Sequence, residues 1–187
     1  MLPDNRGLKA TETPLSGVLV MEPKVFEDDR GFLLESYNER SMAAVGIQAQ
    51  FVQDNHSYSR RNVLRGLHYQ INSSQSKLVR VVVGEIFDVA VDLRRSSATF
   101  GKWFGTRLSG ENRQMLWVPA GFAHGFQVLS EGAHVLYKAT DFYAPQSERT
   151  IAWDDPDLAI QWQLSQRPVV SDKDSKGVLF KTAETFP

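Results

Sequence analysis

The sequence predicts an all-β protein of the sandwich or jelly-roll type with one short helix. Short apolar runs recur at near-regular spacing, and turn residues separate them, which is typical of such folds. Only residues 39–45, between a capping Asn38 and a terminating Gly46, have good helix signals. The length of 187 residues suits a single domain, 1–187, with a sizeable core.

The expected elements follow one another along the chain. Residues 1–16 are polar and contain proline, which predicts an N-terminal arm. Strands are expected at 17–21 and 32–37, on either side of a turn signal at 27–31, and the short helix follows them. Further strands are expected at 50–54, 63–70, 77–83, 86–93, 103–108, 114–118, 123–129 and 133–140. Gly84 and Glu85 predict a tight hairpin. A C-terminal tail is expected at about 165–187, and its polar stretch at 168–176 is solvated on composition alone.

Composition limits the possible partners and compartment. Charged residues make up 23% of the chain and the net charge is −1, so no basic field attracts nucleic acid or an anionic membrane. The chain has no cysteine, which excludes disulfides, zinc–thiolate sites and thiol nucleophiles. No apolar run approaches the length of a membrane span, and the start lacks a signal-peptide core. We therefore expect a cytoplasmic protein that binds neither nucleic acid nor membrane.

Residues 63–80 place polar groups in an apolar strand pattern and predict the floor of an active site. These groups are Arg65, His68, Gln70 and Lys77. Strand alternation puts His68 and Gln70 on one face and Arg65 on the other, unless a bulge at Gly66 turns Arg65 toward them. An imidazole in a cavity can transfer protons near neutral pH. A lone histidine, however, is more often a hydrogen-bonded core residue.

A second polar stretch lies at 118–126, where Pro119, Gly121 and His124 resemble the second half of the metal-binding signature of cupins. Cupins are jelly rolls, so this predicts a cupin-like double-stranded β-helix. A cupin metal site takes two histidines and an acid from its first half. Here the first half offers only His68, with Gln70 in place of a second histidine. We therefore expect no metal and a site for proton transfer.

An ordered set of motifs between about Gly17 and Asp174 resembles the dTDP-4-dehydrorhamnose 3,5-epimerase family. The motifs are QDNHS (53–57), VLRGLHYQ (63–70), KLVR (77–80), FDVAVDLR (87–94), TFG (99–101), PAGFAHGF (119–126) and LYKAT (136–140). The resemblance implies an isomerase of dTDP-L-rhamnose biosynthesis that needs no cofactor. It would invert C3 and C5 of dTDP-4-dehydro-6-deoxy-D-glucose and give dTDP-4-dehydro-L-rhamnose.

The same resemblance implies roles for individual residues. His68 matches the base, Tyr137 the acid on the opposite face of the sugar, and Lys77 the lysine that stabilises the enolate oxygen. An acid that pairs with the histidine is either Asp172 or Asp174, and the spacing favours Asp174. The matching substrate-binding residues are Arg30, Glu35, Gln53, Asn55, Arg65, His124, Glu148 and Lys173.

Aromatic residues and the N-terminal strands add two expectations. Phe32 and Tyr143 are candidates for stacking on the thymine or shaping the sugar pocket, although aromatic residues on strands are more often core. The family forms homodimers that exchange N-terminal strands, so Arg30 and Glu35 could serve the neighbouring subunit's site.

Three other functions stay open from the sequence. The first is a relative that inverts only C3 or only C5 of a dTDP-4-keto-6-deoxysugar in an antibiotic pathway. The second is a metal-dependent cupin dioxygenase or isomerase, which the missing second histidine disfavours. The third is a non-catalytic jelly roll that binds nucleotide sugars, but binding alone requires no acid and base pair.

Overall fold

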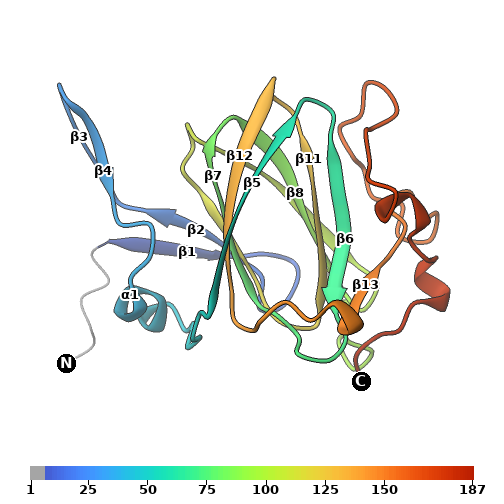
Figure 1. Ribbon diagram of the computed structural model, residues 1–187. Helices are drawn as coiled ribbons and strands as arrows, with labels where there is room; N and C mark the ends of the chain where they lie inside the picture. Colours follow the sequence, from blue (N-terminus) through green and yellow to red (C-terminus); the bar gives the residue numbers. More distant parts are fainter. Residues whose placement is uncertain (1–6) are drawn as a thin grey trace.

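Two antiparallel sheets face each other in the computed structural model, which describes residues 7–187 (Figure 1). The six-stranded sheet has the order β1-β2-β10-β7-β12-β5, and the five-stranded sheet has the order β13-β6-β11-β8-β9. Strands β3 and β4 form a separate hairpin. With a single short α-helix in the described residues, this architecture confirms the predicted all-β class.

The first six strands and the helix are β1 (Leu8–Glu12), β2 (Leu19–Pro23), β3 (Val25–Asp28), β4 (Gly31–Leu34), α1 (Glu39–Ala44), β5 (Gln53–Arg60) and β6 (Leu64–Gln70). The remaining strands are β7 (Lys77–Val83), β8 (Glu85–Asp92), β9 (Trp103–Ser109), β10 (Met115–Val118), β11 (Phe122–Val128), β12 (Gly132–Ala139) and β13 (Glu148–Thr150). Three single-turn 3₁₀ helices are η1 (Pro145–Ser147), η2 (Asp174–Lys176) and η3 (Phe180–Thr182).

Alternate residues of the strands fill the space between the two sheets. Val79 of β7 and Val135 of β12 pack in one cluster with Ile86 and Ala90 of β8, and all four are fully buried. Burying an aliphatic side chain of this size contributes about 1.5 to 3 kcal/mol, so this inner layer is a main source of stability. Since side chains alternate along a strand, polar residues in the same inward rows also point between the sheets.

The outer faces of both sheets are covered in part by other segments. Helix α1 and the residues after it pack on the six-stranded sheet, where Met42 and Ile47 join a cluster with Leu78. The C-terminal segment packs on the five-stranded sheet, where Leu158 joins a cluster with Val89. Figure 1 shows this segment, in orange and red, lying along β6 and β13. Within the expected tail at 165–187, Asp174 and Ala183 are buried and Phe180 and Phe186 pack against this cluster, so the tail is only partly solvated.

Helix α1 begins where the sequence predicts. The Asn38 side chain accepts hydrogen bonds from the backbone N–H groups of Arg40 (2.9 Å) and Ser41 (3.1 Å). These bonds satisfy two of the amides that a helix start leaves unpaired. Within residues 7–187, no helix has the length and apolar composition needed to cross a membrane.

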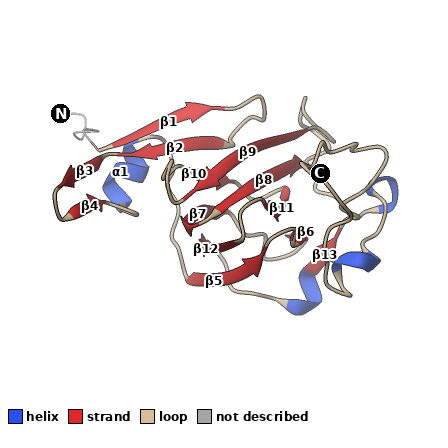
Figure 2. Cartoon of the chain, turned by 90° about the horizontal axis from the view of Figure 1, so that it is seen from above, coloured by secondary structure: helices blue, strands red, loops and turns tan. Residues whose placement is uncertain are grey.

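The N-terminal region contains more strand than predicted. Residues 8–12, expected in the arm, form β1 and pair with β2, while residues 1–6 of the expected arm lie outside the described residues. The stretch interpreted as strand at 32–37 is the second half of a hairpin, β3–β4, which projects away from the sheets (Figure 2). Strands β1 and β3 were missed because their residues are mostly polar and exposed, so they lack the alternation of apolar and polar residues that indicates a half-buried strand.

Two further strand predictions were wrong. Strand β5 spans 53–60 instead of 50–54, because its less exposed, inward residues (Gln53, Asn55, Ser57 and Ser59) are polar and its outward residues are exposed, so apolar alternation is missing. Gly84 does not close a hairpin, since β7 and β8 belong to different sheets. With a φ of +83°, Gly84 instead makes the turn that carries the chain from one sheet to the other.

Candidate active site

Polar side chains from both sheets point into the space between them. On the five-stranded sheet, His68 of β6 lies directly opposite His124 of β11 in the strand register. On the six-stranded sheet, Tyr137 of β12 lies opposite Val79, and Lys77 of β7 lies opposite Ala139. The charge of Glu148 affects the pKa of both Lys77 and Tyr137, and His68 in turn affects the pKa of Glu148. These groups therefore share one neighbourhood.

His68 is held by a carboxylate from the C-terminal segment. Its Nε2 lies 2.5 Å from Oδ1 of Asp174, which is only 3% exposed. Burial alone would raise the pKa of Asp174, but the hydrogen bond and charge of His68, with further hydrogen bonds, hold it below its ordinary value. An ionised carboxylate only accepts hydrogen bonds, so Nε2 carries the hydrogen and Nδ1 is free to take a proton.

The geometry shows which of the two aspartates of the C-terminal segment pairs with His68. Asp174 begins the single turn η2 and points at β6, whereas Asp172 is exposed. The Asp174 backbone N–H donates to Ser171 Oγ at 3.1 Å, which fixes the turn. The spacing argument from the sequence thus selects the residue that the fold brings to His68.

Arg65 points into the site despite its strand parity. Gly66 has a φ of +114°, and the pairing of β6 with β11 shifts register next to it. Arg65 Nε consequently donates to Ser59 Oγ of the opposite sheet at 2.9 Å. A Cβ at Gly66 would lie 2.6 Å from Cα of Gly125, so this position requires glycine. The irregularity expected at Gly66 is confirmed, and simple alternation for Arg65 was wrong.

Lys77 and Tyr137 lie side by side on the other sheet. Lys77 Nζ is 6.0 Å from the centre of the Tyr137 ring. Burial lowers the pKa of Lys77 to about 8, although the charges of Asp88 and Glu148 oppose this. Burial raises the pKa of Tyr137, so its phenol keeps its proton at neutral pH. Tyr137 packs against the inner core, as predicted from its apolar neighbours in the sequence.

A second histidine and carboxylate pair lies next to the first. His124 Nε2 is 2.8 Å from Oδ1 of Asp88 on β8, and both side chains are buried. Sequence analysis did not identify Asp88 as a site residue. Strand alternation could have identified it, because Asp88 lies in β8 between Ile86 and Ala90, whose side chains face the space between the sheets.

Glu148, Lys173 and Tyr143 form a polar group at the edge of the site. Glu148 Oε1 accepts from Lys173 Nζ at 2.8 Å, and Oε2 accepts from the Tyr143 hydroxyl at 3.0 Å. Burial would raise the pKa of Glu148, but these two hydrogen bonds lower it below the ordinary value. Glu148 lies on β13, which pairs with β6 so that Thr150 is opposite His68.

Two amide side chains extend the site along β5. Gln53 Nε2 donates to Asn55 Oδ1 at 2.9 Å, and Gln53 Oε1 accepts from the backbone N–H of Tyr143. Asn55 lies opposite Tyr137. Its Nδ2 is buried and has no hydrogen-bond partner in the described part of the chain. Gln70, in contrast, is bonded to the backbone of Ser73 and Ala144 and ties down loops.

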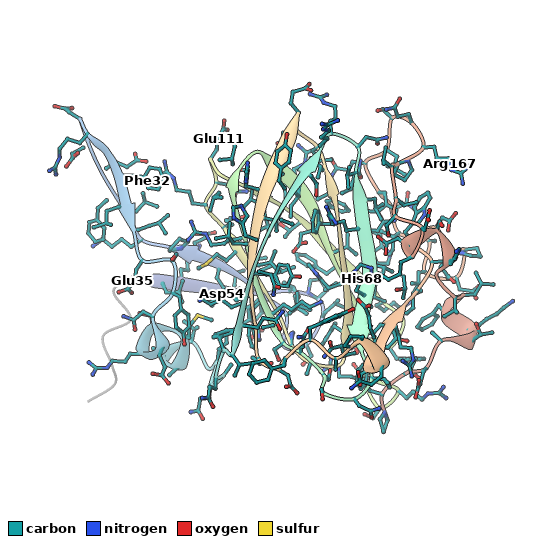
Figure 3. All side chains as sticks on the ribbon, in the orientation of Figure 1. Phe32, Glu35, Asp54, His68, Glu111 and Arg167 are labelled. Carbon is teal, nitrogen blue, oxygen red and sulfur yellow. The ribbon has the colours of Figure 1, made fainter. Side chains whose placement is uncertain are left out.

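The fold does not bring Arg30, Glu35 and Phe32 to His68. Arg30 pairs with Asp28 within the hairpin, and Glu35 accepts from Asn38 Nδ2 at 2.9 Å. Figure 3 shows Phe32 and Glu35 on one side of the molecule and His68 on the other. In residues 7–187, no three histidine, aspartate or glutamate side chains are grouped as metal ligands.

Fold and site together define a cupin-type protein in which side chains able to carry protons come from two facing sheets. The family model described as dTDP-4-dehydrorhamnose 3,5-epimerase matches residues 12–182. The dTDP-4-dehydrorhamnose 3,5-epimerase of Pseudomonas aeruginosa is 59% identical over 181 residues, which are 96% of this chain and 100% of that protein. This chain belongs to the dTDP-4-dehydrorhamnose 3,5-epimerase family, which is a family of isomerases.

Solved structures agree with this assignment. The epimerase of Legionella pneumophila in complex with dTDP-4-keto-L-rhamnose has a TM-score of 0.92 and 48% identity, covering 95% of both chains. A 3'-monoepimerase of Streptomyces bikiniensis in complex with dTDP-quinovose has a TM-score of 0.85 and 34% identity, covering 91% of this chain and 88% of that one. The predicted family, the cupin-like fold and the isomerase class are confirmed.

Proposed function

We propose that this protein inverts C3 and C5 of dTDP-4-dehydro-6-deoxy-D-glucose, which gives dTDP-4-dehydro-L-rhamnose for dTDP-L-rhamnose synthesis. The observation that carries the proposal is the placement of His68 and Tyr137 in the inward rows of opposite sheets, within one charged neighbourhood. A sugar between the sheets would then meet a base and an acid on different faces. The identity to the Pseudomonas aeruginosa enzyme over nearly the whole chain supports the same reaction.

The reaction follows from the C4 ketone of the substrate. The ketone makes the protons on C3 and C5 acidic, because the electron pair left on carbon moves onto O4 as an enolate. His68 Nδ1 takes the proton from one face, and the Tyr137 hydroxyl gives a proton to the opposite face, which inverts the carbon. Each inversion leaves His68 protonated and Tyr137 deprotonated. Proton exchange with solvent restores both before the second carbon reacts.

Two residues support these transfers. The Lys77 ammonium stabilises the negative charge on O4, and losing one such donor typically costs about 3 kcal/mol of barrier. Asp174 holds the ring of His68 and stabilises the imidazolium that forms when the proton is taken. The hydrogen bond between them occupies Nε2, which leaves Nδ1 for the sugar.

The rest of the site supplies partners for the nucleotide. Arg65 and Lys173 provide positive charge for the diphosphate, and Glu148 and His124 provide polar contacts to the sugar and nucleoside. Gln53 and Asn55 provide amides, and the unpaired buried Nδ2 of Asn55 is a donor ready for a ligand oxygen. Tyr143 is placed at the edge of this group, where its ring can stack on the base.

Arg30, Glu35 and Phe32 would act in the site of a second copy of the chain. The hairpin that carries Arg30 and Phe32 projects from the sheets, and it exposes Leu33 to 72% and Phe32 to 55%. Such an exposed apolar hairpin is expected to be covered by a partner. Mixing an inactive His68→Asn chain with an inactive Arg30→Ala chain should restore activity, because mixed dimers contain one complete site. Lack of any restoration in proven mixed dimers, or full activity of a monomer, refutes the exchange.

The function is tested by proton NMR of the substrate incubated with the enzyme in deuterium oxide. Deuterium at both C3 and C5, with inversion at both, supports the proposal. Label and inversion at a single carbon make the protein a single-position epimerase, like the Streptomyces bikiniensis enzyme. Binding of the substrate without label at either carbon indicates a non-catalytic sugar-binding protein.

A further inference from the structure

Asp88 is a buried carboxylate with one oxygen unpaired. It lies in β8 between Ile86 and Ala90, which belong to the inner core, and its side chain is fully buried. Oδ1 bonds His124, while Oδ2 has no hydrogen-bond partner among the described residues. Leaving a buried acceptor unsatisfied costs about 1 to 3 kcal/mol, and more for a charged group. Such a group in an enzyme site calls for a functional explanation.

Lys77 offers the complementary charge from the facing sheet. Its ammonium makes no hydrogen bond or ion pair with any residue in 7–187. Its strand neighbours Val79 and Val81 are in the same inner core as Ile86 and Ala90, so Lys77 and Asp88 both point between the sheets. The charge of Asp88 is the largest influence that opposes the effect of burial on the pKa of Lys77.

Asp92, a second buried aspartate on β8, has a structural role and serves as a comparison for Asp88. Asp92 is also fully buried, but both of its oxygens are satisfied. They accept from Arg94 Nε (2.8 Å) and Nη2 (2.7 Å), and from the hydroxyls of Ser97 and Thr99 (2.6 Å each). Asp92 thus closes a loop and leaves nothing for a ligand. Within residues 7–187, Asp88 in contrast keeps one buried oxygen free for another partner.

We propose that Asp88 is a positioning residue that acts through both His124 and Lys77. One oxygen fixes the ring of His124 with the Nε2 hydrogen toward β8, which leaves Nδ1 for the substrate. The other oxygen, together with the carboxylate of Glu148 and against the positive charge of Lys173, supplies the negative charge that favours the ammonium form of Lys77. The second role rests on the proposed function of Lys77, whereas the charge coupling itself does not depend on any substrate.

The direction of the effect follows from charge. Burial already lowers the pKa of Lys77 to about 8, so the ammonium is lost as the pH rises through that value. Removing the negative charge of Asp88 disfavours the cation further, and Lys77 then loses its proton at lower pH. Close opposite charges typically shift a pKa by 1 to 3 units, and since Lys77 and Asp88 form no direct ion pair, we expect a decrease at the lower end of this range, about 1 unit.

The first experiment measures kcat/KM against pH for the wild type, Asp88→Asn and Asp92→Asn. The alkaline limb should lie near pH 8 in the wild type and about 1 unit lower in Asp88→Asn. Asp92→Asn is the matched control, since it also removes a buried carboxylate from β8, and its limb should not move. Asp88→Glu keeps the negative charge, so the alkaline limb of its profile should stay at the wild-type pH. An unmoved limb in active Asp88→Asn overturns the proposal.

A second experiment needs no turnover. In protein labelled with ¹³C-lysine, the Lys77 Cε signal, assigned by its absence in Lys77→Arg, should titrate at lower pH in Asp88→Asn than in wild type. An unchanged titration in the folded variant overturns the proposal even if the substrate is different. Should Asp88→Asn not fold, the ¹⁵N spectrum of wild-type His124 decides: a hydrogen on Nε2 supports the proposal, and a neutral ring with hydrogen only on Nδ1 overturns it.

Discussion

Replacing Asp174 by asparagine tests the role of the carboxylate that holds His68. The two side chains form a hydrogen bond of 2.5 Å, and the carboxylate is only 3% exposed, so solvent screens it little. A hydrogen bond between charged groups contributes about 1.5 to 3 kcal/mol. The imidazolium forms only when the proton is taken, so this energy is lost mainly from the transition state. At 1.36 kcal/mol per tenfold change in rate, kcat should fall roughly 10-fold to 150-fold.

The asparagine has a further effect that makes this range a lower bound. Its NH₂ group can donate to Nε2 of His68, which moves the ring hydrogen to Nδ1 and blocks the nitrogen that accepts the substrate proton. The analogous replacement in the serine protease triad costs about 10⁴ in kcat for this reason. We therefore expect kcat to fall by about two to four orders of magnitude, between the loss from the missing hydrogen bond and the loss from the wrong tautomer.

The assay is deuterium uptake at C3 and C5 together with the rate of epimerisation. Asp172→Asn is the matched control, because it removes an exposed carboxylate from the same segment and should leave kcat unchanged. Circular dichroism and thermal unfolding show whether each variant is folded. A folded Asp174→Asn enzyme with kcat within about threefold of wild type contradicts the reasoning, since that difference is below 1 kcal/mol.

Three other changes have definite expected results. Tyr137→Phe should reduce epimerisation more than deuterium exchange at the sugar, because only reprotonation needs the phenol; an equal loss of both would show that Tyr137 is not a dedicated acid. Asp92→Asn should lower the free energy of unfolding at pH 7 by about 2 kcal/mol, because burial raises the pKa of Asp92 but its hydrogen bonds lower it to about 2. This stability is present above the ordinary pKa and is lost as the pH falls through the folded pKa of about 2. Denaturant titrations should therefore show the gap between the two proteins reduced to roughly half by about pH 3 and nearly closed below about pH 2, and a constant gap would contradict this. Gly66→Ala should lower the free energy of unfolding by at least about 2 kcal/mol more than Gly31→Ala. Both glycines have a positive φ, but only at Gly66 would a Cβ meet backbone atoms. Equal losses in the two variants would show that the structure around Gly66 relaxes to accept the Cβ.

The sequence determined the fold class and the family, because both depend on local and ordered features. Apolar alternation predicted the inner strands, such as β7 and β12, whose Val79 and Val135 fill the core. The cap at Asn38 predicted the start of α1. The same local patterns failed at β5, where the inward residues are polar and the outward residues are exposed, so no apolar row could be detected.

Only the tertiary structure decided how the site is assembled. The pairing of His68 with Asp174 joins residues 106 positions apart, and the inward turn of Arg65 depends on a register shift between β6 and β11. The open oxygen of Asp88 is likewise visible only once His124 and the row of Lys77 are in place. The sequence encodes which residues can carry protons and charge through their chemistry. Which of them share a low-dielectric space depends on long-range packing, and that packing sets their hydrogen bonds and pKa values.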